Sequence, residues 1–217
     1  MAAEYFCATC GTPFLNEYPL GADGRCGMCR AGAIAFDAAY CFGSYEDSLR
    51  ELIHLLKYTR VKPLARTLGG YLLRALPVDT AFDAVVPVPL HWRRRWERGF
   101  NQAKLLAREV SRKRGVPLIE PLRRVRATTT QTGLTNAKRR DNVAGAFRVR
   151  RGSTIRNLRI LLVDDVMTTG ATASACASVL KRAGARSVTL LTLARVDRRI
   201  PLPAAQFELK ELPGNGH

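Results

Sequence analysis

The sequence contains no long apolar run and no pattern typical of an export signal. None of its stretches approaches the roughly 18 consecutive apolar residues that a membrane-spanning helix needs. The first residues, MAAEYFCATCGTPF, lack the basic stretch followed by an apolar one that marks a secretory signal. We therefore expect a soluble, cytoplasmic protein without a membrane span.

Two common nucleotide-binding motifs are also missing. The chain has no G-x-G-x-x-G fingerprint of a dinucleotide site and no G-x-x-x-x-G-K-[ST] loop of a P-loop nucleotidase. Any phosphate site in this protein must therefore be built in another way.

Acidic residues are scarce in one third of the chain. Between His91 and Arg156 there are 19 Lys/Arg and 4 Asp/Glu, a net charge of +15 out of +17 for all 217 residues. A field of that sign concentrates phosphorylated metabolites, nucleic acid or anionic lipid. The alternative is a solvated basic surface that keeps the protein in solution.

The patterning favours an α/β fold with a mostly parallel sheet, because strands and helices alternate along the chain. Apolar runs predict strands at 82–90, 117–125, 159–163 and 187–194. Helical spacing predicts helices at 101–114 and 172–183, and two more between 40 and 76 that are broken near Pro63. We expect four segments: a cysteine-rich module at 1–36, a helical connecting segment at 37–80, the main domain at 81–200 and a surface tail at 201–217.

The most informative motif is ILLVDDVMTTGAT, which runs from Ile160 to Thr172. Unpaired N–H groups of a tight turn and of a first helical turn bind phosphate, and carboxylates accept hydrogen bonds from the vicinal hydroxyls of a ribose. The motif therefore indicates a 5-phosphorylated ribose, with its hydroxyls on Asp164 and Asp165. The phosphate would lie on Thr168, Thr169, Gly170, Ala171 and Thr172. A simple threonine N-cap would explain Thr172 but not the two acids.

Five of the six cysteines lie within the first 41 residues, and four of them form two CxxC pairs. Cys7, Cys10, Cys26 and Cys29 could place four thiolates around one tetrahedral zinc ion. A structural Zn²⁺ would explain how so short and turn-rich a segment folds. Four thiolates leave no open position for catalysis. Two redox-active dithiols are the alternative.

VDDVMTTGAT resembles the loop that binds 5-phosphoribosyl pyrophosphate (PRPP) in type I phosphoribosyltransferases. Other segments resemble the ComF family of competence proteins, which includes GntX-like proteins, over nearly the whole chain. These segments are the CxxC pairs, LIHLLKY around Lys57, VVPVPL, RGFNQA from Arg98 to Ala103, and Q-x-x-L…R-x-x-N from Gln131 through Arg139 to Asn142. The tail and the length of the basic loop match poorly. The resemblance implies a type I phosphoribosyltransferase sheet preceded by a small zinc-ribbon-like module.

The resemblance also implies how the pyrophosphate is held. The loop after the strand at 84–88 would be the pyrophosphate loop, with Arg98 as its best candidate and the cluster Arg93–Arg95 as an alternative. The 126–146 loop would close over PRPP and bring in Arg139, unless it is a disordered basic linker. Asp164, Asp165, Arg98 and Arg139 would then be the catalytic residues, with Mg²⁺ bound together with PRPP.

Two functions stay open at this point. The first is a phosphoribosyltransferase, a glycosyltransferase of pentosyl groups, whose acceptor the sequence does not reveal. The second is a non-catalytic accessory protein of DNA uptake and natural competence, which the ComF resemblance implies. Its partners would be single-stranded DNA and the competence helicase machinery, with PRPP as a regulatory ligand. The fold alone does not decide between them.

Overall fold

The computed structural model describes residues 5–58, 63–90, 99–126 and 143–196. The elements in chain order are β1 (Tyr5–Phe6), β2 (Pro13–Phe14), α1 (Gly27–Arg30), β3 (Ala38–Ser44), α2 (Asp47–Tyr58), α3 (Leu64–Ala75), β4 (Ala84–Pro87), α5 (Gln102–Arg114), β5 (Leu122–Arg124), β6 (Phe147–Val149), β7 (Arg159–Met167), α7 (Ala171–Arg182) and β8 (Ser187–Arg195). Within the described ranges, no helix has the length and apolarity needed to cross a bilayer.

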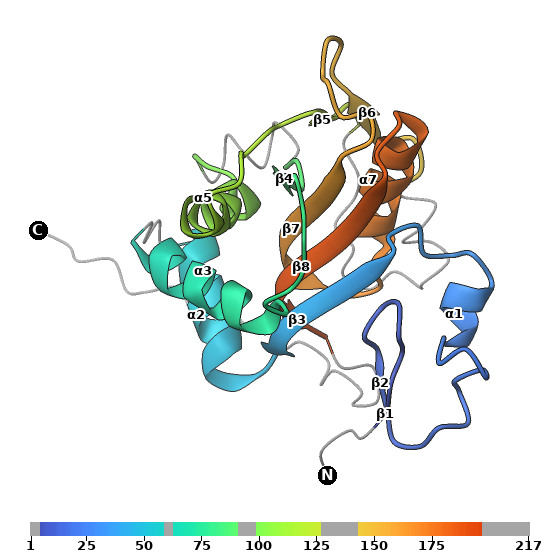
Figure 1. Cartoon of the computed structure of the whole chain (residues 1–217). Coiled ribbons are helices and arrows are strands. Elements are labelled where there is room, and N and C mark those ends of the chain that lie inside the picture. Colours follow the sequence, from blue (N-terminus) through green and yellow to red (C-terminus); the bar gives the residue numbers. More distant parts are fainter. Residues whose placement is uncertain (1–4, 59–62, 91–98, 127–142, 197–217) are drawn as a thin grey trace, which may run out of the picture.

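A four-stranded parallel sheet forms the centre of the molecule, with the strand order β3-β8-β7-β4 (Figure 1). Its two inner strands, β7 and β8, pair along almost their whole length. The apolar runs AVVP in β4 and ILLV in β7 are fully buried, as expected for parallel strands covered on both faces. The predicted α/β fold with a mostly parallel sheet is confirmed.

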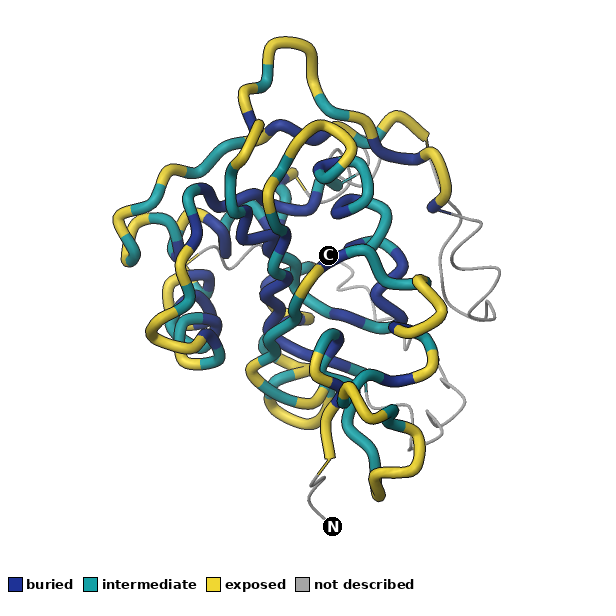
Figure 2. Tube along the Cα trace, turned by 45° about the vertical axis from the view of Figure 1, so that its right-hand side comes forward, coloured by how far each residue is buried: buried dark blue, intermediate teal, exposed yellow. Residues whose placement is uncertain are grey.

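The two faces of the sheet carry separate hydrophobic clusters, because successive side chains of a strand point to opposite sides. On one face α2, α3 and α5 cover the sheet, and Leu72 and Leu106 pack near Leu161. On the other face α7 covers it, and Leu180 packs near Leu162. Figure 2 shows the buried segments running through the centre of the fold, with exposed residues on the loops and outer helix surfaces.

Two predicted segments differ from the structure. The segment 37–80 contains the two expected helices, but it begins with β3, which pairs in parallel with β8 at the edge of the sheet. It is therefore part of the sheet and more than a helical connection. The strand expected at 117–125 is reduced to β5, which pairs in antiparallel fashion with β6, while Leu118 makes a single bridge to Val85. The three boundaries between the four segments remain predictions, and the tail lies outside the described residues.

The N-terminal module packs against the carboxyl end of the sheet and the start of α7. Arg195, only 8% exposed at the end of β8, donates hydrogen bonds to the Cys10 carbonyl and to Thr12 Oγ1. Ser174 Oγ accepts the N–H of Ala35 at 3.0 Å. The module therefore shares its core with the main domain, and its cysteines belong to the α7-side cluster.

Candidate functional site

Asp164 and Asp165 lie at the carboxyl edge of the sheet, where β4 and β7 separate. The N–H of Val88 donates to the Val163 carbonyl at 2.9 Å, which is beyond the last paired residue of β4. In contrast, β8 stays paired with β7 as far as Met167. The sequence predicts that β7 ends at Val163, but in the structure it continues to Met167. Such an edge, where one neighbouring strand stops, is where open α/β sheets bind ligands.

The two carboxylates point to opposite faces of the sheet, as neighbours in a strand do. Asp165 faces α2, where Lys57 Nζ lies 3.2 Å from its Oδ2. Asp164 lies on the α7 side, close enough to Cys176 for its charge to raise the pKa of that buried thiol further. Asp164 Oδ1 accepts the Asp165 N–H at 2.9 Å, and Asp165 Oδ1 accepts the Val166 N–H at 2.7 Å. The local backbone thereby orients both carboxylates.

The electrostatic environments of the two acids differ. Burial and the neighbouring charge of Asp165 raise the pKa of Asp164 to about 8, although Lys57 and Arg124 act in the opposite direction. Asp164 keeps some exposed surface, so a ligand can still reach it. Burial disfavours the ammonium of Lys57, but the attraction of Asp165, Tyr45 and Asp164 outweighs it and raises the pKa of Lys57. At neutral pH the lysine is therefore charged, and Asp164 can hold a proton.

The turn from Thr168 to Thr172 opens α7, as the sequence predicts. Gly170 precedes the helix with a φ of 74°, and Ser174 donates its N–H to the Gly170 carbonyl at 2.7 Å. Thr169 is buried and its Oγ1 accepts the Ala171 N–H at 3.2 Å. Thr169, Gly170 and Ala171 are buried, whereas Thr168 and Thr172 are partly exposed.

Replacing Gly170 by alanine is expected to lower the free energy of unfolding by about 1–2 kcal/mol, because the left-handed conformation is strained for a residue with a Cβ. That Cβ would lie 3.4 Å from Ile34 Cδ1, so the packing offers no relief. Urea unfolding measures the change. Gly70→Ala is the matched control, since Gly70 lies inside α3 and the same substitution there should stabilise by about 0.5–1 kcal/mol. Equal effects of the two variants would contradict the prediction.

The four N-terminal cysteines are brought together and are all buried. Their sulfur atoms lie within 4.8 Å of one another. The Cys7–Cys29 and Cys10–Cys26 sulfur pairs are 3.7 Å and 3.8 Å apart. A tetrahedral zinc site with Zn–S bonds of about 2.3 Å has S···S edges of about 3.8 Å, so the cluster has the dimensions of an S₄ site.

The pKa values of the thiols in the cluster are also consistent with binding of a cation. Burial opposes ionisation of Cys7, but backbone N–H groups of Cys10, Cys26 and Thr9 outweigh it and lower the pKa of Cys7 to about 7. Burial and the charge of Cys10 raise the pKa of Cys29 far above its ordinary value. Four such thiols cannot all ionise without a positive charge among them, so the group could bind a metal such as zinc.

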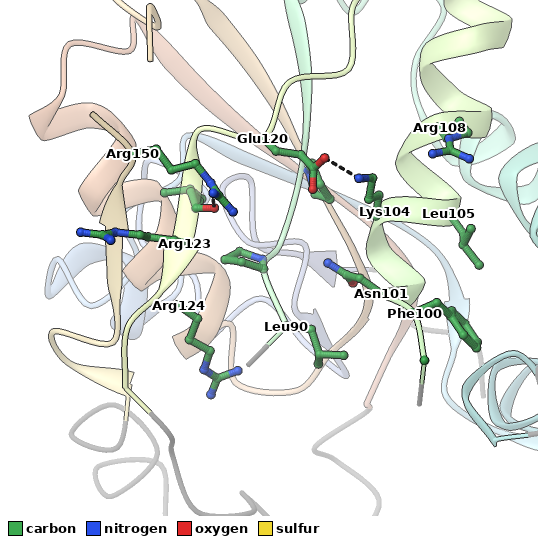
Figure 3. Close-up of a pocket in the computed structure, with 14 residues that line it drawn as sticks. Leu90, Phe100, Asn101, Lys104, Leu105, Arg108, Glu120, Arg123, Arg124 and Arg150 are labelled. Carbon is green, nitrogen blue, oxygen red and sulfur yellow. Dashed lines mark hydrogen bonds and ion pairs between the residues drawn. The ribbon is translucent and has the colours of Figure 1, made fainter. Parts of the chain in front are cut away.

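A basic cavity of about 330 Å³ lies beside the end of β4, whose Pro87 pairs with Val163, the residue before the acidic doublet Asp164–Asp165. Figure 3 shows Lys104 and Arg108 on the α5 side and Arg123, Arg124 and Arg150 on the β5–β6 side. The one acid among its lining residues, Glu120, pairs with Lys104 at 2.5 Å. Arg124 links this cavity to the doublet, because its charge also lowers the pKa of Asp164.

These cations belong to the basic segment that the sequence reveals, but no sequence pattern predicts that they lie together. Their spacing along the chain shows no motif, and only the fold, which places α5, the end of β4 and the β5–β6 pair around one cavity, brings them together. Lys57 lies in a segment that resembles the family, but the sequence predicts no role for it. Arg98, Arg139 and the Arg93–Arg95 cluster lie outside the described residues, whereas Gly99 lines the cavity.

Comparisons with known proteins give matches in sequence and in structure. Residues 97–211, more than half of the chain, match the family model described as the phosphoribosyl transferase domain. The chain is 34% identical over 197 residues to DNA utilization protein YhgH of Salmonella typhimurium, covering 87% of this chain and 83% of that protein. It is 32% identical over 201 residues to competence protein F of Haemophilus influenzae, covering 88% and 84%. The solved adenine phosphoribosyltransferase of Thermoanaerobacter pseudethanolicus aligns with 64% of this chain and 84% of its own, at 16% identity and a TM-score of 0.41.

The parallel sheet and the matched domain define a protein with the type I phosphoribosyltransferase fold. Within that class the chain belongs to the ComF family of competence-associated proteins, with which it shares about a third of its residues over most of its length.

Proposed function

We propose that the chain binds PRPP at the carboxyl edge of its sheet and transfers or senses the 5-phosphoribosyl group. The observation that supports this most directly is the position of Asp164 and Asp165. They lie on β7, which leads into the Gly170 turn and pairs with β4, and the basic cavity lies beside the end of β4. A ligand with a phosphate at one end, sugar hydroxyls in the middle and a pyrophosphate at the other end matches this order of groups.

Transfer from PRPP is a substitution at the anomeric carbon, in which pyrophosphate leaves and positive charge develops on the ribose. Asp164 and Asp165 would hold the ribose hydroxyls, and Thr168–Thr172 would hold the 5-phosphate. Arg98 and Arg139 would stabilise the leaving pyrophosphate, with Lys104 and Arg124 of the cavity as further cations. Mg²⁺ bound with PRPP would neutralise part of the pyrophosphate charge.

The cysteine cluster supports a structural Zn²⁺ as a second part of the proposal. All four sulfurs are buried and none of the cysteines lines the basic cavity, so the ion would stabilise the module without taking part in transfer. Thiolates kept for a metal require a reducing compartment, and on that ground we place the protein in the cytoplasm.

A second function is favoured by the same basic cavity. Five cations against one acid, with Leu90 and Phe100 among the lining residues, suit a nucleic-acid strand with its phosphates and bases. Relatives of this chain are named for DNA utilization and competence. We therefore propose a role in DNA uptake, with single-stranded DNA and the uptake helicase machinery as partners and PRPP as substrate or regulator.

Calorimetry with Mg–PRPP tests the first proposal. The wild type is expected to bind, and Asp165→Asn is expected to weaken binding at least about 100-fold, because it removes a charge-assisted hydrogen bond to the sugar together with its ion pair. Asp37→Asn is the matched control, since it removes an exposed ion pair with Lys181. Absence of binding by the wild type would refute the proposal. Titrating the same variants with single-stranded oligonucleotide at several salt concentrations separates the functions, since DNA binding should survive in Asp165→Asn.

A further inference from the structure

Lys57 and Asp165 form an unusually sheltered ion pair. The pair joins the last turn of α2 to β7, with a distance of 3.2 Å between Nζ and Oδ2. Their side chains are 16% and 15% exposed. In each of the other ion pairs found among the described residues, at least one side chain is more than 40% exposed. Removing two charges from water is costly. A sheltered pair such as this one is therefore a candidate for a functional role.

The surroundings divide the acidic doublet into two unlike halves. Asp165 contacts an ammonium, and Tyr45 lies beside it with its ring centroid 5.9 Å from the Lys57 Nζ. Asp164 faces the other side of the sheet, where its charge acts on the thiol of Cys176 on α7 and the guanidinium of Arg124 on β5 lowers its pKa. Among the described residues no ion pair reaches Asp164, and its pKa is raised to about 8 by burial and by Asp165.

We propose that Lys57 is a positioning residue that fixes Asp165 as the charged acceptor for one ribose hydroxyl and leaves Asp164 to carry a proton for the other. The inference rests on the proposed binding of PRPP, and it adds a division of labour between the two acids. Neighbouring carboxylates whose surroundings favour different protonation states take different roles, one accepting and one able to donate.

The charge balance explains why this division matters. PRPP is a polyanion, and two bare carboxylates under its ribose would repel it. With Lys57 in place and Asp164 protonated, the charges of this group sum to zero. Above about pH 8, Asp164 loses its proton and the group becomes negative. Affinity for Mg–PRPP should therefore decline through that range in the wild type.

The wild type provides the first test. Carboxyl-carbon NMR should show Asp164 titrating near pH 8. A pKa of Asp164 near the ordinary value of 3.8 would overturn the proposal without the use of any variant.

Three variants provide the second test, by calorimetry with Mg–PRPP between about pH 6 and 9. Lys57→Met should weaken binding about tenfold or more at pH 7 and move the alkaline decline to higher pH, because both carboxyls lose their cation. Lys57→Arg should restore both properties. Lys181→Met, which removes an exposed Lys–Asp pair at the opposite edge of the sheet, should behave as the wild type.

These outcomes distinguish a failure of the proposed role of Lys57 from a failure of the proposed PRPP binding. If Lys57→Met and Lys181→Met show the same affinity and the same pH profile, Lys57 has no positioning role, and PRPP binding still stands. If neither they nor the wild type bind Mg–PRPP, the proposed function fails and this inference fails with it.

Discussion

Substitution of Asp164 by asparagine is expected to stabilise the ligand-free protein at alkaline pH while leaving it unchanged in acid. Burial and the charge of Asp165 raise the pKa of Asp164 to about 8, from an ordinary value of 3.8. The folded chain therefore binds this proton more tightly than the unfolded chain does. This tighter proton binding stabilises the folded state fully below about pH 4. The stabilisation is lost as pH rises from there towards 8.

The asparagine variant has no such loss, because its amide stays neutral and can still accept the Asp165 N–H through Oδ1. A tenfold change in proton affinity corresponds to about 1.4 kcal/mol, so even half of the full effect would raise Tm by roughly 6–11 °C at pH 8.5. Calorimetric melting at pH 4 and pH 8.5 measures the difference. Asp37→Asn, at an exposed carboxylate paired with Lys181, serves as the control. A gain at pH 4 equal to that at pH 8.5 would contradict the assigned cause.

The same variant separates the roles of the two acids in ligand binding. Because asparagine resembles a protonated aspartic acid in shape and can donate a hydrogen bond, Asp164→Asn should retain Mg–PRPP binding within about tenfold at pH 7. It should also lose the alkaline decline expected of the wild type. Asp165→Asn should be far more damaging, since it replaces the charged member of the doublet. The reverse ranking would show that the negative charge of Asp164 is what the ligand needs.

The sequence predicted the parallel sheet and the positions of most elements because their signals are local. ILLV is typical of a buried strand, and α5 ends at Gly115, whose φ of 65° suits glycine at a helix end. In contrast, β3 was missed. Its sequence, AAYCFGS, has partly buried and exposed residues along an edge and lacks a strong apolar period. Its pairing depends on β8, more than 140 residues later, which no local pattern records.

The site shows the same division between local and long-range information. Asp164, Asp165 and the Gly170 turn lie within one short motif, so the sequence alone predicts that they form one site. Lys57 reaches Asp165 from α2 across more than 100 residues, and the cavity cations come from α5 and β5–β6. Their convergence depends on tertiary packing. The structure also shows that adjacent acids in a strand face opposite ways, which the motif alone does not convey.

If the four-cysteine cluster binds zinc as proposed, removal of the metal should have the largest effect on stability. Cys29→Ser, at a fully buried position, is expected to abolish metal binding and to lower Tm by about 10 °C or more. The module has little core of its own, and its unfolding would leave the buried guanidinium of Arg195 without the Cys10 carbonyl and Thr12 hydroxyl. Metal analysis of protein purified without added metal, together with melting curves, measures both effects. Cys41→Ser, outside the cluster, is the control.

A metal bound by the cysteines should also affect the Gly170 turn, because the N-terminal module packs against this turn. Ile34 and Phe36 would lie 3.4–3.5 Å from a Cβ at Gly170, and Ser174 Oγ bonds to Ala33 and Ala35. Zinc-selective chelation, with Mg²⁺ kept in excess, should therefore weaken Mg–PRPP binding at a temperature where the sheet stays folded. Ser174→Ala keeps the metal ligands but removes these bonds, so it should retain metal and show a smaller loss of affinity. A metal-free wild type with unchanged Tm and unchanged affinity would show that the cysteines are neither a structural site nor a support for the turn.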